Sequence, residues 1–282
     1  MKETAVIDTA NPAPTETPLR VHPPARAARE LLFNLVAREL KARYKGSALG
    51  FLWTLLTPLF MAVIYVVFLR ILAGPDVRLE EIVIGVFAWT FTVQSVQSGL
   101  TAVTGNANLV KKVRFPRALL PVAATAANLV SFLLTLVVQF VIVGLLAREG
   151  RFFSAWSLGL PALIALHTAF NLALAMLLGA ANVYFRDTQH LVGVGLSAWF
   201  FLSPAMYNLT LLERWTATRP WLLQAYLANP LAPILTGYRA LLLGQAFPWG
   251  WGAAVGLALP LPLLAAAGAV YRRAQRNFAD YL

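Results

Sequence analysis

Six long apolar stretches dominate this sequence and restrict it to one class of fold. A helix needs about 20 residues, at 1.5 Å each, to cross the hydrocarbon core of a bilayer. Hydrophobic residues make up 59% of the 282 positions and charged residues 12%, unlike a soluble domain. We predict an all-α integral membrane protein with six transmembrane helices, at residues 51–73, 82–103, 118–146, 158–184, 191–207 and 249–271.

Two segments outside these stretches have a composition of their own. Residues 1–28 contain five prolines and mixed charges but no apolar core of a signal peptide, which indicates a disordered cytoplasmic tail. Residues 208–248 are too apolar for a solvated loop, yet Pro220, Pro230 and Pro233 interrupt them. We predict short re-entrant helices there, in the outer leaflet and covered by protein. Residues 29–282 then form a single transmembrane domain.

The basic residues are distributed unevenly between the two sides of the predicted membrane domain. With a cytoplasmic N-terminus, 16 of the 23 lysines and arginines fall on the inner side and 7 on the outer side. This bias predicts that both termini are cytoplasmic. A positive inner face that meets anionic lipid accounts for most of the net charge of +11 without nucleic acid as a partner.

A basic amphipathic helix precedes the first predicted span, at residues 29–46. Its apolar stripe includes Leu31, Leu35 and Leu40, and Arg38, Lys41 and Lys45 follow on another face at spacings of three and four. Such a helix usually lies flat in the membrane interface. The pattern alone favours a passive anchor, and the alternative is a gate at the mouth of a pore.

Several kinds of chemistry are missing from the predicted spans. Their interiors contain no Asp, Glu, Lys or Arg, the groups that ion-coupled transporters and proton pumps need at depth. His167 and Asn171 share a helix face, and we interpret them, like Asn128, as interhelical hydrogen-bonding groups. The chain has no phosphate-binding loop, no HExxH helix and no cysteine, so we expect no ATP site, no metal site and no enzymatic activity in this chain.

Two cytoplasmic connections have patterns that allow a docking function. In residues 106–117, Asn106 is placed to cap a short helix with Leu109, Val110 and Val113 on one face and lysines opposite. This segment is either a positive-inside loop on anionic lipid or a docking helix for a cytoplasmic partner. In residues 182–190, Arg186 and Asp187 favour a charged turn that stops one helix and caps the next.

Aromatic residues recur along the first and fifth predicted spans. By default such side chains face lipid or pack between helices. They are Trp53, Phe60, Tyr65 and Phe68 in the first span and Trp199, Phe200, Phe201 and Tyr207 in the fifth.

Five motifs follow one another along the chain. The first is the run ARELKARYKGSALGFLWTLLTPL at residues 37–59, which contains Arg43, Tyr44, Leu49, Gly50, Trp53 and Pro58. The others are NANLVKKVRFPRALLP, NVYFRDTQHL, FLSPAMY and NPLAPILTGYRALLLG. In this order they resemble the permeases of bacterial ATP-binding-cassette transporters that export polysaccharides, the O-antigen, capsule and teichoic-acid exporters. The named residues of the first run match the family pattern, the second and third motifs resemble the family's two cytoplasmic loops, and the last two resemble the end of its fifth span and its outer re-entrant segment.

The resemblance implies a half-permease that works as a homodimer in the bacterial inner membrane. Two nucleotide-binding ATPase subunits would dock beneath it and carry the ATP and Mg²⁺. A lipid-linked glycan would pass through a pore at the dimer axis. The family pattern implies that the following residues belong to the gate helix: Arg38, Lys41, Arg43, Tyr44 and Lys45.

The two cytoplasmic loops correspond to the family's coupling helices, which receive mechanical work from the ATPase. The residues expected to couple to the ATPase are Asn108, Leu109, Lys111, Lys112, Arg114, Phe115, Pro116, Arg186 and Asp187. An uncharged, hydroxylated glycan suits a pore of aromatic rings without fixed charges, because weak binding at many sites lets a long chain slide. The aromatic residues expected to line such a path are Trp53, Phe60, Tyr65, Phe68, Trp199, Phe200 and Tyr207.

Other functions stay open at this point. An exporter of a small lipid or a drug has the same architecture. A membrane-embedded glycosyltransferase or acyltransferase requires acidic or histidine residues at a membrane-facing site, and these are scarce here. A structural membrane anchor does not need the ordered cytoplasmic motifs. The identity of the glycan is not readable from the sequence.

Overall fold

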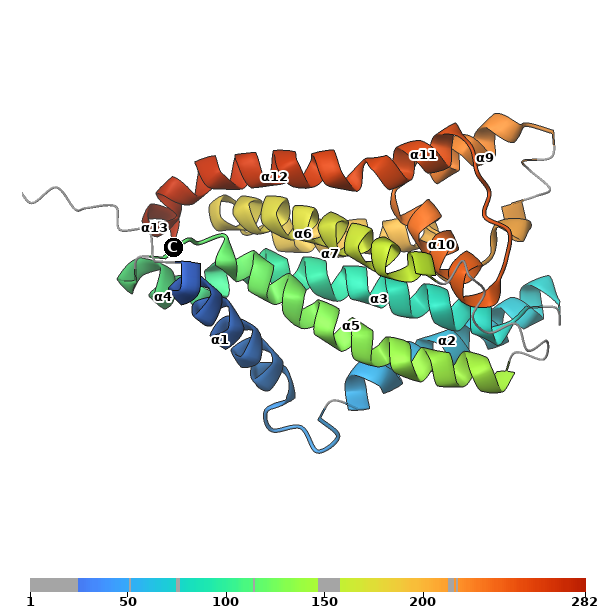
Figure 1. Cartoon of the computed structure of the whole chain (residues 1–282), viewed down its shortest axis with the longest axis horizontal. Helices are drawn as coiled ribbons and strands as arrows, with labels where there is room; N and C mark the ends of the chain where they lie inside the picture. The colour runs from blue at the N-terminus through green and yellow to red at the C-terminus, as the bar shows by residue number, and fades with distance from the viewer. Residues whose placement is uncertain are drawn as a thin grey trace, which may run out of the picture.

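The computed structural model describes residues 25–50, 52–74, 77–113, 115–146, 158–212, 216 and 218–282. Every regular element within these ranges is a helix, which confirms the all-α prediction, and the long helices run along one common direction (Figure 1). Arg114 and residues 1–24 of the predicted tail lie outside the described residues. The elements are α1 (Ala25–Tyr44), α2 (Leu52–Ala73), α3 (Leu79–Thr101), η1 (Thr104–Asn106), α4 (Ala107–Lys112), α5 (Leu119–Leu146), α6 (Leu160–Tyr184), α7 (Thr188–Phe201), η3 (Leu209–Leu212), α9 (Pro220–Leu227), α10 (Leu231–Leu243), α11 (Trp251–Ala258), α12 (Pro260–Ala274), η4 (Gln275–Asn277) and α13 (Phe278–Tyr281).

Five helical segments in the described part of the chain are long and apolar enough to cross a membrane, so the chain is a multi-pass membrane protein. They are α2, α3, α5, α6 and the combination of α11 with α12, and they match five of the six predicted spans to within a few residues. The last of them is interrupted at Leu259. Pro260 follows this break, where its ring and missing N–H disturb the helix.

The predicted fifth span, residues 191–207, is not among these five segments. α7 ends at Phe201, and residues 202–207 continue as turns and bends. Its 14 residues cover about 21 Å, less than the hydrocarbon core of about 30 Å. Pro204 explains the early end, since the residue before a proline avoids the helical conformation. The run of apolar residues continues past Phe201, so composition did not reveal where the helix stops.

Helix α3 is the centre of the bundle and packs against α2, α5, α6 and α10. Small residues permit its close crossing with α6. A Cβ atom at Gly99 would lie 2.3 Å from the Cβ of Ala175, and one at Gly179 would lie 2.6 Å from the Gly99 carbonyl oxygen. Close backbone approach at small residues is a common way for membrane helices to associate.

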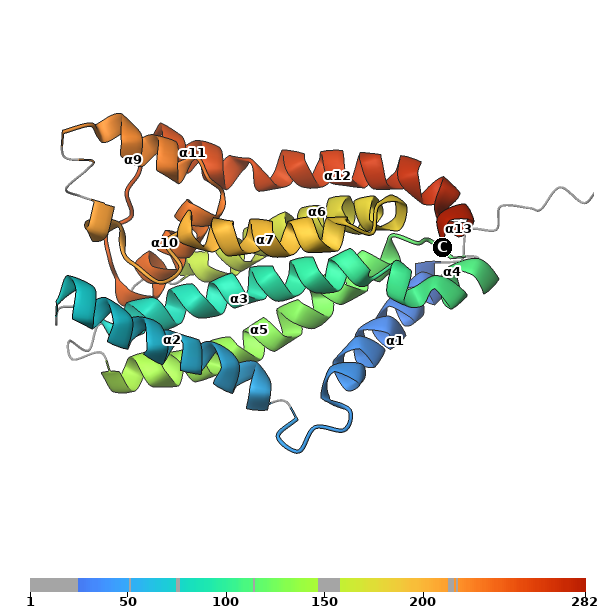
Figure 2. The same cartoon turned by 180° about the vertical axis from the view of Figure 1, so that it is seen from behind.

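Two short helices, α9 and α10, connect α7 to α11 at the end of the bundle where α3 begins (Figure 2). Pro220 and Pro230 stand at the beginnings of these helices, where a missing N–H costs little. α10 ends at Gly244, whose φ of +65° lies in the left-handed region that glycine favours. The structure thus has the predicted short helices, and their position in the outer leaflet stays a prediction.

His167 and Asn128 form hydrogen bonds with neighbouring helices, as predicted. His167 Nε2 lies 2.7 Å from Thr92 Oγ1, and its Nδ1 lies 3.3 Å from the hydroxyl of Tyr238. Asn128 Nδ2 donates to Ser98 Oγ on α3 at 3.0 Å. Asn171 differs: it is fully buried, and neither of its amide atoms has a hydrogen-bond partner within the described residues. Its predicted interhelical bond is therefore wrong in this structure.

Candidate functional site

The candidate functional site is the end of the bundle that carries α1, α4 and the turn between α6 and α7. α1 lies along α5 (Figure 1). Leu35 is buried against the bundle and Leu31 is half-buried, while Lys41 and Lys45 are exposed, as the amphipathic pattern predicts. The side chain of Tyr44 lies outside the described parts of the chain.

The loop after α1 turns sharply before α2 begins. Gly46 and Gly50 have φ angles of +78° and +47°. Glycine adopts this left-handed region without the steric cost that a Cβ atom adds. The two glycines therefore permit the sharp turn between α1 and α2.

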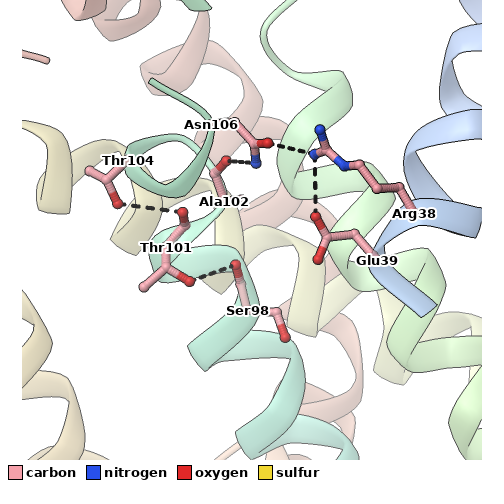
Figure 3. A network of polar contacts seen from close by, with 7 residues as sticks. All are labelled: Arg38, Glu39, Ser98, Thr101, Ala102, Thr104 and Asn106. Carbon is pink, nitrogen blue, oxygen red and sulfur yellow. Dashed lines mark hydrogen bonds and ion pairs between the residues drawn. The ribbon is translucent and has the colours of Figure 1, made fainter. Parts of the chain in front are cut away.

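Arg38 connects α1 to the corner at which the first predicted cytoplasmic loop, residues 106–117, begins. Its Nη2 donates to Oδ1 of Asn106 and lies 3.6 Å from the Glu39 carboxylate (Figure 3). Asn106 in turn donates through Nδ2 to the carbonyl oxygen of Ala102 at 2.8 Å. Asn106 was predicted to cap α4, and it does stand at the N-cap position. Its side chain makes no capping bond, however, because it is committed to Ala102 and Arg38.

Arg43 points into the bundle rather than toward the headgroup layer. Its Nη2 donates to Asn128 Oδ1 at 2.7 Å and its Nη1 to Ser131 Oγ at 3.4 Å, both on α5. Asn128 bonds at the same time to Ser98 on α3. A single arginine thereby ties the end of α1 to two helices of the bundle. A helix that is anchored only by lipid does not require such a specific contact between one side chain and the bundle.

Replacing Arg43 with methionine should loosen α1 while leaving its apolar stripe intact. Loss of a charge-assisted bond to the buried Asn128 amide costs about 1.5–3 kcal/mol. We expect a lower thermal midpoint in detergent and faster proteolysis within residues 25–50. Lys41→Met is the matched control, because Lys41 is an exposed cation on the same helix. Equal midpoints for the two variants would contradict the role assigned to Arg43.

Helix α4 presents its charges outward. Val110 is buried and Leu109 half-buried, whereas Asn108, Lys111 and Lys112 are exposed. The predicted apolar face is therefore only partly correct.

Val113 was predicted to belong to the apolar face of this loop, and the structure contradicts that prediction. The helix ends at Lys112, and Val113 takes an extended conformation with φ −124° and ψ 135°. Its side chain is 49% exposed. Beyond it, Phe115 is half-buried and Pro116 exposed.

The second connection predicted to be cytoplasmic is a short turn, as expected from its sequence. α6 ends at Tyr184 and α7 begins at Thr188, and both Arg186 and Asp187 are exposed. Asp187 stands at the N-cap position of α7, but its side chain makes no capping bond. Phe185 is 72% exposed, an unusual position for a phenyl ring in a charged turn.

The aromatic residues predicted for a glycan path divide into two groups. Trp53, Phe60 and Phe68 are about half exposed on α2, the least buried of the long helices together with the last span. The other four pack inside the molecule. The ring centroids of Tyr65 and Phe200 lie 5.3 Å apart.

The remaining two aromatic residues are held by hydrogen bonds. Trp199 packs edge-on against Phe170 and donates from Nε1 to Asn229 Oδ1 at 3.0 Å. The hydroxyl of Tyr207 lies 2.9 Å from that of Tyr226. The structure thus brings α2 and α7 together at Tyr65 and Phe200 but leaves the exposed rings of α2 on a separate face.

A buried arginine at the opposite end of the molecule escaped the sequence analysis, which placed Arg239 in an outer segment without a role. Arg239 is 1% exposed, donates from Nε to the carbonyl oxygen of Glu81 at 2.9 Å and from Nη2 to that of Ala205 at 3.1 Å. The Glu81 carboxylate accepts bonds from Asn208 and Gln245. The signal available in the sequence was an arginine inside the apolar run of residues 229–244.

The charge states of this outer network follow from its burial. Burial raises the pKa of the Tyr226 hydroxyl and lowers the pKa of the Arg239 guanidinium to about 10. At neutral pH the tyrosine is therefore neutral and the arginine remains a cation. The cation joins the start of α3, the loop after α7 and α10.

A multi-pass helical bundle with a basic amphipathic helix and charged turns at one end is consistent with a membrane transport protein. The chain belongs to the ABC-2 type transporter family, whose model matches residues 30–243. This confirms the resemblance seen in the motifs. Membership of the family implies a partnership with ABC ATPase subunits.

Two curated relatives align with most of the chain. The O-antigen export system permease protein RfbA of Myxococcus xanthus is 33% identical over 255 residues, which cover 89% of this chain and 95% of the relative. The protein of the same name from Klebsiella pneumoniae is 27% identical over 257 residues, 90% of this chain and 95% of the relative. Both relatives are named as transport proteins rather than as enzymes.

Proposed function

We propose that the chain is the membrane-spanning half of an ATP-driven exporter that moves a lipid-linked polysaccharide of the O-antigen type across the bacterial inner membrane. The observation that carries this proposal is the alignment with an O-antigen export permease over 95% of that relative's length. The family match over residues 30–243 includes both predicted cytoplasmic loops and α1 from Glu30 onward. The absence of a phosphate-binding loop in the sequence supports ATP and Mg²⁺ on a separate subunit.

The proposed topology has six crossings with both termini in the cytoplasm. α13 contacts α4, and both lie at the end of the bundle where α1 begins, which requires an even number of crossings (Figures 1 and 2). Five crossings are the long apolar segments. We assign the sixth to α7 together with the buried turn at Ser203, Pro204 and Ala205, which lengthens the path of the short helix.

The working assembly in this proposal is a homodimer with two ATPase subunits. α4 and the turn at residues 185–187 receive the ATPase, and α1 acts as the gate for the incoming lipid-linked glycan. Lys41 on α1 and Lys45 just after it are exposed cations available to a pyrophosphate headgroup. The exposed rings of Trp53, Phe60 and Phe68 are candidates for stacking on sugars along the pore.

Deletion of the gene in its host tests the proposed function. We expect the lipid-linked glycan precursor to accumulate in the inner membrane while the surface polysaccharide is lost, and a plasmid copy of the gene to restore export. The readouts are chemical analysis of the surface polysaccharide and of the extracted precursor. An unchanged surface polysaccharide would favour the alternative, an exporter of a small lipid or drug.

A further inference from the structure

The last residues of the chain fold back over the cytoplasmic end of the bundle. After α12, the short helices η4 and α13 turn away from the span (Figure 1). α13 contacts both α4 and α6. We call residues 275–282 the C-terminal cap. The sequence analysis assigned it no role.

Three hydrogen bonds surround the beginning of the C-terminal cap. The hydroxyl of Tyr184 donates to the carbonyl oxygen of Ala274 at 2.8 Å. Arg117 donates from Nη1 to the carbonyl oxygen of Gln275, and its own carbonyl oxygen accepts a bond from Tyr271 at 3.1 Å. Tyr184 is the last residue of α6, and Arg117 follows the first cytoplasmic loop. The cap is therefore bonded next to both loops.

Phe278 fixes the C-terminal cap by apolar contacts. Its side chain is fully buried and belongs to the same core cluster as Val110 of α4. Its ring centroid lies 5.4 Å from that of Tyr271 and 6.1 Å from that of Tyr184. Tyr184 also meets Tyr281 edge-on at 4.7 Å. Phe278 on α13 thus links α4 to the end of α6.

The side chains opposite these buried contacts are exposed. Lys111 and Lys112 project from α4, and Phe185 follows Tyr184 with 72% of its surface exposed. Exposed aromatic residues held on a rigid base are typical anchors of protein interfaces. The two lysines are complementary to acidic groups on the surface of a binding partner.

We propose that the C-terminal cap locks the two cytoplasmic loops into one preformed surface, which docks on the ABC ATPase through Phe185 in an apolar recess and through Lys111 and Lys112 on acidic groups. This inference rests on the proposed function. A preformed surface loses less conformational entropy on docking than two independent loops. Phe185 is the central anchor of the surface, and Phe278 is a positioning residue that acts through α4 and Tyr184.

Binding of the purified ATPase subunit to the full-length permease in lipid nanodiscs tests this inference. We expect Phe185→Ala and Phe278→Ala each to weaken binding at least about ten-fold. Phe185→Ala should keep the thermal midpoint of the parent, since the ring is exposed. Arg276→Ala and Asn277→Ala are matched controls, because both side chains lie on the C-terminal cap and are exposed. Phe278→Leu, which refills much of the buried volume, should restore most of the binding.

The possible outcomes distinguish a failure of this inference from a failure of the proposed function. Parent-like binding by Phe185→Ala and Phe278→Ala would overturn the inference and leave the proposed function standing. Failure of the parent itself to bind the ATPase would overturn the proposed function and the inference together. If Phe278→Ala does not fold, the double variant Tyr184→Phe with Arg117→Gln takes its place. It removes only the side-chain hydrogen bonds to the beginning of the C-terminal cap. Loss of vesicle binding by Phe185→Ala, with ATPase binding unchanged, would assign the ring to lipid and overturn the inference.

Discussion

Replacing Gly99 with leucine should prevent the bundle from assembling. Even the first carbon of any side chain at this position would lie 2.3 Å from the Cβ and 2.7 Å from the Cα of Ala175. These atoms belong to the α6 backbone and its shortest side chain, so neither can rotate away. The two helices must separate, and the buried faces of α3 and α6 lose their packing. Overpacking of a core costs about 1–3 kcal/mol of stability. Because the clash at Gly99 involves backbone atoms of α6, we expect a loss at or above the upper end of this range.

Substitution by alanine is expected to have opposite effects on stability at Gly99 and at Gly195. Alanine normally stabilises a helix by about 1 kcal/mol relative to glycine. Gly195→Ala, on the exposed side of α7 with nothing within 4 Å, should therefore raise the thermal midpoint or leave it unchanged. Gly99→Ala should lower it, and Gly99→Leu should abolish the monodisperse peak in size-exclusion chromatography. A stable Gly99→Leu protein would show that the α3–α6 crossing is wrong.

Reversing the charges of Lys111 and Lys112 should stop export without disturbing membrane insertion. Both side chains project from α4, which is held from behind by buried Val110. Two glutamates would meet the acidic groups that we expect on the ATPase, and like charges in an interface cost several kcal/mol. We expect export to fall at least about ten-fold, since each 1.4 kcal/mol is a factor of ten. Fourteen other basic residues remain on the predicted inner side, so the topology should survive.

The control for this experiment carries the same change in charge. Arg272 and Arg273 are exposed in the last turn of α12, on the same side of the membrane. Their double reversal to glutamate should leave export close to the parent level. Export is measured as surface polysaccharide per molecule of permease in the membrane. A similar loss in both double variants would indicate a general effect of negative charge rather than a docking role for α4.

The site could be predicted from the sequence only as far as its motifs. The placement of α4 and the turn at Arg186 and Asp187 followed from helix-breaking residues and charges close together in the chain. The contacts of Arg43 did not follow, because Asn128 is 85 positions away along the chain. Val113 was wrongly assigned to the apolar face because the six-residue helix α4 ends at Lys112, one residue before the apolar pattern ends. The gate and glycan-path residues remain predictions about function.

The sequence by itself determined the class of protein and nearly all of its long helices. A bilayer offers backbone groups no hydrogen-bond partners, so an apolar run of sufficient length has to be a helix whatever surrounds it. Charge bias likewise predicts orientation without knowledge of contacts. The tertiary structure decided why Arg239 is buried beside Glu81 and how Phe278 joins the two loops. These features depend on residues more than 100 positions apart, and no local pattern contains such pairings.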